Sequence, residues 1–507
     1  MNDFPSLGES MPGHLSSLPS AVPQRPLPSV LVMTHSHPKL TRGGAEISAF
    51  TLFRELKARG AKAWLLGCSS PKSEVRLGAT LTQPYGPDDY VYHPNAAFDY
   101  FKFANPDPQF PKIIEELVAE LKPDIVHTHH FVRFGVEMFS AIRRGWPSAK
   151  IVLSLHEYLA ICNHHGQMMK PKTFRLCEKE SYSACAACFP QLGERDFFLR
   201  KRYLQMFFED VDLFISPSHF LAERFRSWGL PAEKLAVLEN MPPERGGSAF
   251  ARAYDEQAAG TSGSPAITTP TPVAPTNPGR AQRLDAVLSA GTVRSGHATG
   301  SSGSWSSRGQ FLSGEVPASQ APTDLRELRF GFFGQMSPLK GITVLMDAAK
   351  RLSGMGISNA VIEIYGDYSS QPLEFQKVVE EALEEAGENV VFHGAYDNAQ
   401  VNTLMQRIDA MIIPSTWWEN SPVVIQEAFT NGKPVICSNI GGMAEKVTDG
   451  VNGLHFEVSR PAALAEILAD LATFPEKLAA LAAGVRPPPT AEEVLDAHLS
   501  LYENVIS

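Results

Sequence analysis

The sequence predicts an α/β protein made of two Rossmann-like domains that face a central crevice, with a long disordered insert between them. Three observations support this fold class. Short buried strands alternate with helices in two separate stretches of the chain, as in parallel, doubly wound sheets. A stretch rich in Gly, Ser, Thr, Pro and Ala divides these two stretches. Loops with glycine and polar residues follow several of the predicted strands.

The first domain is predicted over residues 28–243. It opens with the apolar strand 28–34, and a glycine-containing loop then leads to helix 45–57, where Ile47, Phe50 and Phe53 recur at helical spacing. The other elements that the pattern predicts here are strand 61–67, helix 113–121 and strands 124–127, 150–155 and 213–216. Strands this short and this apolar are typical of a sheet that is covered on both faces.

Two segments lack the apolar residues that a core needs. The leader, residues 1–27, is rich in Pro and Ser, and residues 244–325 contain very few aromatic side chains. Neither segment can bury enough apolar surface to offset the entropy lost on ordering. Both are therefore predicted to be disordered.

The second domain is predicted over residues 326–489, and the apolar spacing of residues 490–507 predicts a closing helix. The predicted strands are 328–334, 360–365, 390–393, 410–413, 434–438 and 453–456. The predicted helices are 341–352, 373–386, 399–407 and 422–430. This alternation forms a second complete α/β domain.

Composition excludes some functions. The chain has 507 residues and a formal net charge of −10, so it lacks the overall basic character of a nucleic-acid-binding protein. No apolar run is long enough for a membrane-spanning helix, and the N-terminus lacks the basic and apolar regions of a secretory signal. We expect a cytoplasmic protein, with membrane contact only at the inner surface.

The strongest motif runs from Pro414 to Glu445. A buried strand ends near Pro414, and Glu419 lies in the following loop, eight positions before Glu427 inside the next predicted helix. Pro422 suits a first helical position, with Ser421 as its cap, and the helix start around Val423 suits an anionic group. The Gly441–Gly442 pair opens the next loop, where backbone can approach a phosphate closely.

Three further loops follow predicted strands. Gly334-Gln335 and Lys340 come after the first strand of the second domain, and a lysine there can neutralise a departing diphosphate. Gly43 and Gly44 come after the first strand of the chain, and His156 follows the strand 151–155. The run His127-Thr-His129-His130 ends another strand, where we prefer structural or crevice-lining roles to a metal site.

Glu419 and Glu427 resemble the two glutamates of the E-x7-E motif in family-four retaining glycosyltransferases of the GT-B fold. The resemblance extends to the surrounding glycines, to the Gly43–Gly44 loop, and to His156, which resembles a family histidine at a strand end near the transferred sugar. It covers residues 28–243 and 326–507. The family usually has Gly-Arg where this chain has Gly334-Gln335, so Lys340 carries more of the neutralisation here.

The resemblance implies a function and a set of roles. The chain would move a sugar from a nucleotide-sugar donor, UDP- or GDP-linked, to a hydroxyl of a glycan or lipid-linked acceptor in surface polysaccharide synthesis, with retention and without a catalytic metal. The implied catalytic residues are His156, Lys340 and Glu419. The implied donor-binding residues are Gly43, Gly44, Gln335, Lys340, Ser421, Pro422, Val423 and Glu427.

Two other functional classes remain open. One is a catalytically silent scaffold that binds nucleotide sugars, which the glutamine at position 335 and the insert allow. The other is a GT-B enzyme of different chemistry, an epimerase or a phosphorylase. An epimerase is not expected to carry E-x7-E in this context, and no clear site for a phosphorylase cofactor is present.

Four of the six cysteines fall in one short stretch: Cys162, Cys177, Cys185 and Cys188. The C-x2-C pair of Cys185 and Cys188 is typical of structural zinc sites, with His164 and His165 as alternative ligands. A structural zinc and four reduced thiols are both open interpretations. A disulfide framework is not expected in a cytosolic chain.

Residues 195–208 mix basic and large apolar side chains. Such a stretch can contact an anionic membrane and a lipid-linked acceptor. More often it is a half-buried helix with an exposed basic edge, which is the reading that we prefer.

Overall fold

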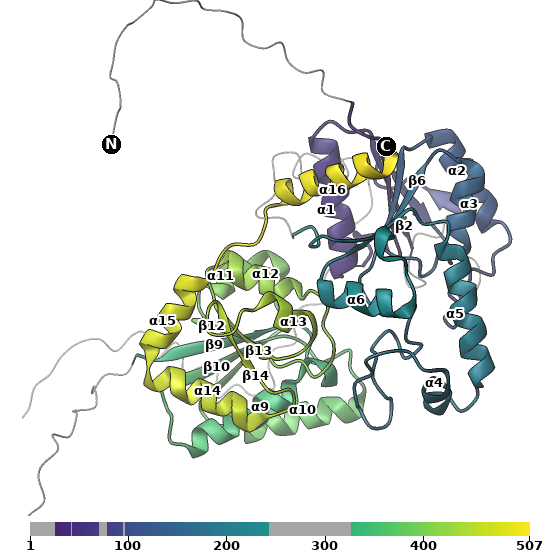
Figure 1. The fold of residues 1–507 in the computed structure, drawn as a ribbon. Helices are drawn as coiled ribbons and strands as arrows, with labels where there is room; N and C mark the ends of the chain where they lie inside the picture. The colour runs from purple at the N-terminus through teal and green to yellow at the C-terminus, as the bar shows by residue number, and fades with distance from the viewer. Residues whose placement is uncertain (1–25, 42, 70–78, 95–96, 243–325) are drawn as a thin grey trace, which may run out of the picture. The chain divides into compact units, whose positions relative to one another are not determined.

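The computed structural model describes residues 26–41, 43–69, 79–94, 97–242 and 326–507. The predicted disordered insert lies outside the described residues, as does all of the predicted leader except residues 26 and 27. The described residues form two lobes, each built on one sheet (Figure 1).

The first lobe contains an eight-stranded sheet in the order β3-β4-β2-β1-β5-β6-β7-β8. All neighbouring strands are parallel except β3 and β4. The strands are β1 (Val30–Thr34), β2 (Ala63–Cys68), β3 (Leu81–Thr82), β4 (Asp89–Tyr92), β5 (Ile125–Thr128), β6 (Lys150–Ser154), β7 (Leu213–Ser216) and β8 (Leu235–Val237).

Helices cover both faces of this sheet, and every residue of β1, β2, β5 and β7 is buried. The helices of the lobe are α1 (Gly44–Ala58), α2 (Phe110–Leu121), α3 (Glu137–Gly145), α4 (Tyr182–Cys188), α5 (Glu194–Phe208) and α6 (His219–Trp228). Because both faces are covered, side chains that point to either side of a strand enter an apolar core, which explains the continuous apolar runs in the sequence.

The second lobe has a six-stranded, fully parallel sheet in the order β11-β10-β9-β12-β13-β14. Its strands are β9 (Leu328–Phe333), β10 (Ala360–Tyr365), β11 (Val390–Gly394), β12 (Ala410–Ile413), β13 (Val435–Ser438) and β14 (Gly453–Phe456). The strand order reverses between β9 and β12, as in the Rossmann fold. The predicted fold class of two Rossmann-like domains is confirmed.

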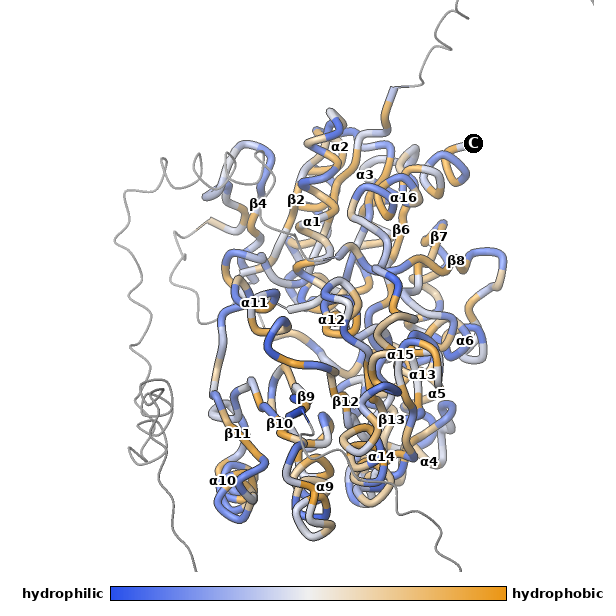
Figure 2. The backbone as a smooth tube through the Cα atoms, turned by 90° about the vertical axis from the view of Figure 1, so that its left-hand side faces the viewer, coloured by the Kyte–Doolittle hydropathy of each residue, from blue (hydrophilic) through white to orange (hydrophobic). Residues whose placement is uncertain are grey.

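Seven helices of the second lobe connect these strands or follow them: α9 (Ile342–Gly354), α10 (Leu373–Glu385), α11 (Val401–Met405), α12 (Val423–Thr430), α13 (Gly441–Lys446), α14 (Pro461–Thr473) and α15 (Pro475–Gly484). Figure 2 shows the pattern behind this packing: helices α9 and α10 carry both hydrophobic and hydrophilic residues along their length. Most apolar residues of α9 enter the core of the lobe, whereas α10 contributes mainly Val379, with Phe375, Ala382 and Leu383 packed against that core.

Helix α16 (Ala491–Ile506) returns to the first lobe. Its start is fixed by a capping box, in which Thr490 and Glu493 exchange hydrogen bonds. Leu495, Leu499 and Tyr502 share one apolar core with β1 and α1. The predicted closing helix is therefore part of the first lobe's core.

Some predicted elements differ from the structure. The pair Gly441–Gly442 does not open a loop, because α13 starts at Gly441. The single helix predicted over 399–407 is a 3-10 turn, Asn398–Gln400, followed by the short helix α11. The pattern also missed the strands β3, β4 and β8 and the helices α3, α4, α6, α14 and α15.

Among the described residues, no helix has the combination of length and apolar character that crossing a membrane requires.

Candidate active site

The loops that carry the predicted site residues leave the carboxyl ends of strands where each sheet reverses its order. In the first lobe these are the loops after β1 and β5, and in the second lobe those after β9 and β12. Ligands of open parallel sheets bind at this edge, beside the point of reversal. The topology therefore brings the Gly43–Gly44, Lys340 and Glu419 loops to the edges where a ligand is expected.

Lys340 and Glu419 form an ion pair with 2.5 Å between Nζ and Oε1. The same carboxylate oxygen also accepts hydrogen bonds from Ser415 Oγ at 2.8 Å and from Trp417 Nε1 at 3.0 Å. The Glu419 side chain is buried, and that of Lys340 is more than one-third exposed. Three donors thus hold Glu419 in place, and one of them is a cation that a ligand can reach.

Glycine at position 341 explains why Lys340 reaches this carboxylate. Gly341 has φ +71°, and a Cβ there would lie 1.8 Å from the carbonyl oxygen of Pro414. Only glycine allows the two loops to approach this closely. A larger residue would push the lysine loop away from the loop that carries Glu419.

The start of α12 differs from the prediction. Pro422 is the N-cap residue, not the first helical residue, and Ser421 does not cap the helix. Ser421 lies before a proline, which disfavours helical backbone, and its hydroxyl donates to Glu239 of the first lobe at 2.5 Å. Because α12 has no side-chain cap, its start at Val423 suits an anionic group, although the Ile425 N–H donates to the Pro422 carbonyl at 3.0 Å.

The Gly441–Gly442 pair contacts the Glu419 loop. The Gly442 N–H donates to the Glu419 carbonyl at 2.7 Å, and a Cβ on Gly442 would lie 1.7 Å from the Asn420 carbonyl oxygen. These glycines were predicted to let the backbone approach a phosphate. In the structure they let it approach the backbone of the Glu419 loop. In this way they fix the backbone on both sides of Glu419.

His156 lies beside the same loop. Its carbonyl oxygen accepts a hydrogen bond from Asn420 Nδ2 at 2.7 Å, and its Nε2 is 3.1 Å from His129 Nδ1. Burial, followed by the charge of His130, lowers the pKa of His156 to about 3. The imidazole is therefore neutral near pH 7, and it can accept one hydrogen bond and donate another.

Two histidine–carboxylate pairs lie near His156. His35 Nε2 is 3.2 Å from Glu46 Oε1, and His130 Nε2 is 2.9 Å from Glu157 Oε1. The rings of His35 and His130 are 4.4 Å apart. Burial, with nearby positive charges, lowers the pKa of His35 to about 2, and burial raises the pKa of Glu46. These groups form a polar surface next to the predicted catalytic histidine.

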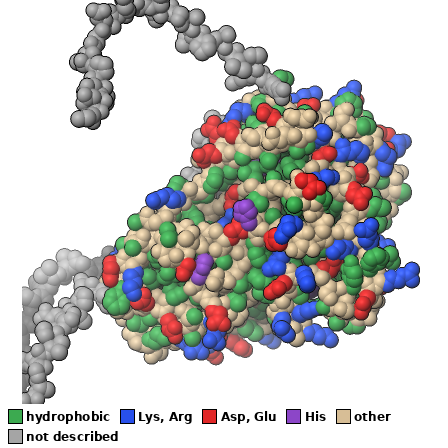
Figure 3. Space-filling view, in the orientation of Figure 1, with side chains coloured by type: hydrophobic (Ala, Val, Ile, Leu, Met, Phe, Trp, Pro, Cys, Tyr) green, Lys and Arg blue, Asp and Glu red, His purple; other side chains and the backbone are tan. Residues whose placement is uncertain are grey.

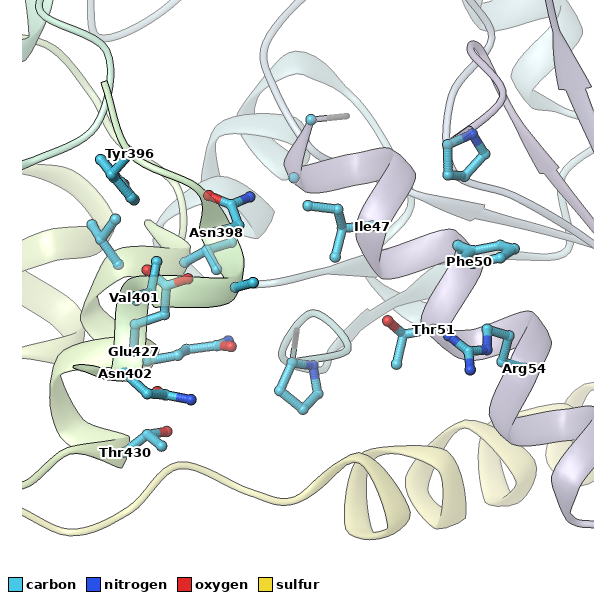
Figure 4. Close-up of a pocket in the computed structure, with 18 of the residues that line it drawn as sticks. Ile47, Phe50, Thr51, Arg54, Tyr396, Asn398, Val401, Asn402, Glu427 and Thr430 are labelled. Atoms are coloured by element: carbon cyan, nitrogen blue, oxygen red, sulfur yellow. The ribbon is translucent and has the colours of Figure 1, made fainter. Parts of the chain in front are cut away.

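A pocket of about 870 Å³ contains four of the predicted donor-binding residues. Gly43, Gly44, Val423 and Glu427 all line it. Figure 4 shows Ile47, Phe50, Thr51 and Arg54 of α1 on one side and Glu427 and Thr430 of α12, with Tyr396, on the other. The pocket also includes Pro38, Lys39, Pro242, Asn398, Ala399, Val401, Asn402, Val424 and Gln426.

Glu427 is the ionisable group of this pocket whose pKa is most clearly displaced. Burial raises its pKa from 4.5 to about 7. A carboxyl group with this pKa changes charge across the physiological range. Such a displacement inside a large pocket is common at ligand-binding and catalytic sites.

The structure divides the predicted residues into two groups. Lys340, Glu419 and His156 are joined through the Glu419 loop, whereas Gly43, Gly44, Val423 and Glu427 line the pocket. Gln335 belongs to neither group, because it is exposed and donates to Ser370 Oγ at 2.8 Å. Ser421 and Pro422 lie in the sequence between Glu419 of the first group and Val423 of the second.

Sequence reasoning missed several residues of the site. Ser415, Trp417 and Asn420 lie inside the recognised motif, but their contacts depend on the loop's shape. Glu239 follows β8, a strand that the sequence pattern did not predict, so its position at the end of a parallel strand could not be seen. Its carboxylate also pairs with Lys446 of α13.

The four clustered cysteines meet at one small cavity. Cys162, Cys177, Cys185 and Cys188 line a space of about 30 Å³ together with His164, and His165 is not among its lining residues. All four are free thiols. Among the described residues, no group of three or more His, Cys, Asp or Glu side chains is arranged to hold a metal ion.

Comparison with known families gives two matches. Residues 42–241 match the family Glycosyltransferase Family 4, and residues 319–486 match the family Glycosyl transferases group 1. Between them, these matches cover nearly all of both lobes.

Individual proteins are similar over shorter stretches. The chain is 35% identical over 128 residues to a lipopolysaccharide 1,2-N-acetylglucosaminetransferase of Salmonella typhimurium, which is 24% of this chain and 33% of that protein. It is 32% identical over 158 residues to a D-inositol 3-phosphate glycosyltransferase of Corynebacterium urealyticum, covering 30% and 36%. The chain spans about a third of the length of the curated relatives it matches.

Solved structures share the two-lobed fold. The Anabaena protein Alr3699/HepE, crystallised with UDP, has a TM-score of 0.57 and 16% identity, and covers 94% of this chain and 100% of its own.

Proposed function

Because the chain belongs to the family-4 glycosyltransferases of the GT-B fold, we propose that it transfers a sugar from a nucleotide-sugar donor to a hydroxyl of a glycan or lipid-linked acceptor, with retention of the anomeric configuration. The proposal includes a cytoplasmic location, with contact at the inner face of the membrane, and a role in surface polysaccharide synthesis. The lipopolysaccharide transferase among the relatives supports this class of acceptor.

The observation that carries the proposal is the meeting of Lys340 and Glu419 beside His156. A reactive sugar nucleotide presents hydroxyl groups and a diphosphate that gains charge as the bond to the sugar breaks. Glu419 can accept hydrogen bonds from the sugar hydroxyls, and Lys340 can move from Glu419 to the diphosphate. The neutral His156 can hydrogen-bond to the sugar without competing for the anion.

The pocket beside this group fits the nucleotide half of the donor. Glu427 would accept hydrogen bonds from the ribose hydroxyls, and the uncapped start of α12, with Gly44 opposite Val423, would bind the diphosphate. Solved relatives of the fold bind UDP, UDP-glucose or ADP, which supports a nucleotide-sugar donor. Gln335, which is exposed and bonded to Ser370, can hydrogen-bond to the donor but brings no charge to the diphosphate.

The mechanism that follows needs no covalent enzyme intermediate. The acceptor hydroxyl attacks from the face that the diphosphate leaves, and the departing phosphate oxygen takes the hydroxyl proton. Lys340 and the helix start stabilise the charge that develops on the diphosphate. A double displacement would require a carboxylate beside the anomeric carbon. Glu419, which three donors hold on one oxygen, is better suited to binding hydroxyl groups.

A donor screen tests the proposal. We expect one of the UDP-, GDP- or ADP-sugars to raise the melting temperature of the protein and to be hydrolysed slowly. We expect Glu427→Ala to abolish both effects, because the ribose loses its acceptor. If folded wild-type protein responds to no sugar nucleotide, the proposal is wrong. If a sugar nucleotide stabilises the protein but is neither transferred nor hydrolysed, the silent scaffold is the better interpretation.

The pKa of Glu427 adds a sharper readout to the same screen. With a pKa of about 7, the side chain is about one-tenth ionised at pH 6 and about nine-tenths ionised at pH 8. A carboxylate accepts hydroxyl hydrogen bonds more strongly than a carboxylic acid does, so donor affinity should rise from pH 6 to pH 8. Glu427→Gln is the matched control and should flatten this profile. An equal slope in the variant would assign the titration to another group.

The structural zinc stays a prediction that rests on the spacing of Cys162, Cys177, Cys185 and Cys188 and on their common cavity. Metal binding would require deprotonated thiols, whereas burial raises the pKa of Cys162, Cys177 and Cys185. Metal analysis of the purified protein decides between zinc and four reduced thiols. No catalytic metal is required by the proposed chemistry.

A further inference from the structure

One side of α5 exposes large apolar side chains to solvent. Phe198 is 45% exposed, Leu199 is 49% exposed and Met206 is 52% exposed. Arg195 and Arg202 lie on the same exposed side, which therefore alternates cations with apolar groups. The opposite side of the helix packs into the lobe through Phe197, Arg200, Leu204 and Phe208.

The segment around Phe101 extends this surface. Tyr100 is 60% exposed, and Lys102 is exposed beside it. A shallow groove of about 530 Å³ joins the segment to α5, and its lining includes Phe101, Lys102, Leu199, Arg202 and Met206. We call Tyr100, Lys102, Arg195, Phe198, Leu199, Arg202 and Met206 the α5 face. Figure 3 shows hydrophobic side chains next to Lys and Arg over α5.

The α5 face carries three cations: Arg195 in the first turn of the helix, Arg202 in its middle, and Lys102 in the neighbouring segment. Three acidic residues lie at the ends of the helix: Glu194 and Asp196 in its first turn, and Glu209 directly after its last residue. Asp196 and Glu209 also line the groove. Soluble proteins rarely leave several large apolar groups together in solvent unless they bind something. The mixture of arginines with Phe, Leu and Met on one helix face is typical of helices that lie in the plane of a membrane interface.

A neighbouring turn has the same character. It lies between Met169 and Leu176, which pair as an antiparallel bridge, and its exposed residues include Lys172, Phe174 and Arg175. Phe174 is 64% exposed. Lys170 ties the turn to α4 by donating to the Ala184 carbonyl at 3.1 Å, and α4 contacts α5 through the rings of Tyr182 and Phe198.

The α5 face is rigidly joined to the loop that carries His156. The buried Arg200 donates from Nε to the Phe101 carbonyl at 2.7 Å, from Nη1 to Ala160 at 2.7 Å and from Nη2 to Leu159 at 2.6 Å. Leu159 and Ala160 follow His156 by three and four residues. One guanidinium group therefore links the exposed helix, the Tyr100 segment and the predicted catalytic loop.

We propose that the α5 face docks on an anionic lipid bilayer and so holds the His156 loop next to acceptors embedded in that bilayer. Phe198, Leu199 and Met206 enter the boundary between headgroups and acyl chains, and the three cations pair with lipid phosphates. This inference rests on the proposed function and, within it, on a lipid-linked acceptor. It requires surface binding only and no segment that crosses the membrane.

Vesicle co-sedimentation of the full chain, without donor or acceptor, tests the inference. The wild type should bind vesicles of equal parts phosphatidylglycerol and phosphatidylcholine and bind phosphatidylcholine alone much more weakly. Arg195→Glu/Arg202→Glu should lower the partition coefficient by about tenfold or more, since each cation near an anionic surface contributes to binding. Phe198→Ser/Leu199→Ser should lower it by about tenfold, because two exposed apolar groups are lost. All four positions are exposed, so the variants should fold.

The matched control is Leu373→Ser/Val378→Ser on α10, where the side chains are 75% and 43% exposed. It should bind anionic vesicles like the wild type. The inference fails if the wild type does not bind anionic vesicles, or if the α5-face variants bind as well as it does. It also fails if the wild type is a dimer that does not bind vesicles and the α5-face variants are monomers. That result would show that the α5 face serves self-association. Donor hydrolysis by the α5-face variants should equal that of the wild type. The hydrolysis assay therefore tests the transferase proposal, and vesicle binding tests the membrane inference.

Discussion

Lys340→Ala is expected to lower the rate of sugar transfer by about 10²–10³-fold. The lysine is the cation that lies at the predicted catalytic group, 2.5 Å from Glu419, and its side chain is accessible to a ligand. Removing it takes away the charge that would stabilise the departing diphosphate. It also leaves the buried Glu419 without its ionic partner. The loss should appear mainly in kcat, measured with the donor that the screen identifies.

Lys350→Ala is the matched control for this substitution. Lys350 also forms a lysine–glutamate ion pair, with Glu385, but the pair lies on the surface between α9 and α10. Exposed pairs of this kind contribute little to stability, about 0–1 kcal/mol, so the control should keep wild-type activity. A Lys340→Ala protein that is folded and transfers at the wild-type rate would remove the lysine from the mechanism.

Arg200→Met is expected to lower the free energy of unfolding by about 3–5 kcal/mol. Arg200 is 1% exposed, and its three nitrogens satisfy three carbonyl oxygens. Burial lowers the pKa of its guanidinium to about 10, which still leaves it charged at neutral pH. Methionine fills much of the same volume and supplies no donor, so the carbonyls of Phe101, Leu159 and Ala160 lose their partners.

The measurement is the shift in thermal or urea midpoint, with Arg202→Met beside it. Arg202 is exposed on the same helix, and its loss should change stability by at most about 0.5 kcal/mol. Equal midpoints for the two variants would mean that the carbonyls find other partners. A second readout is donor turnover, which should fall in Arg200→Met at temperatures where the protein is still folded, because the loop after His156 loses two hydrogen bonds.

The sequence predicted the buried strands best. The predicted strands 213–216, 360–365 and 410–413 coincide with β7, β10 and β12. Every residue of these three strands is buried and most are apolar, so each strand stands out as a short, mainly apolar stretch. Among the strands that the pattern missed, β4 is mostly buried, but β3 has only two residues and all its side chains are partly exposed. Its existence depends on pairing with β4, which the sequence pattern does not encode.

The candidate site could be predicted in its residues but not in its contacts. Lys340 and Glu419 were both singled out, because each follows a strand and matches a recognised motif. Their ion pair joins positions 79 residues apart and depends on the close approach of Gly341 to Pro414. The bond between Ser421 and Glu239 joins the two lobes, and it replaced the helix cap that local sequence favoured. Local patterns describe one segment at a time, so contacts of this kind are outside their reach.

Helix α16 has a consequence for the order in which the chain folds during synthesis. Nδ1 of the buried His127 lies 2.7 Å from the hydroxyl oxygen of Tyr502, 375 residues later in the chain, and the two groups share a hydrogen bond. Leu495 and Leu499 complete the apolar core around α1. The ribosome makes the first lobe early, yet this lobe cannot finish its core until residues 491–506 emerge. The second lobe has its whole sheet by then. Vectorial synthesis therefore predicts that the lobe made first is the last to reach its final protease resistance.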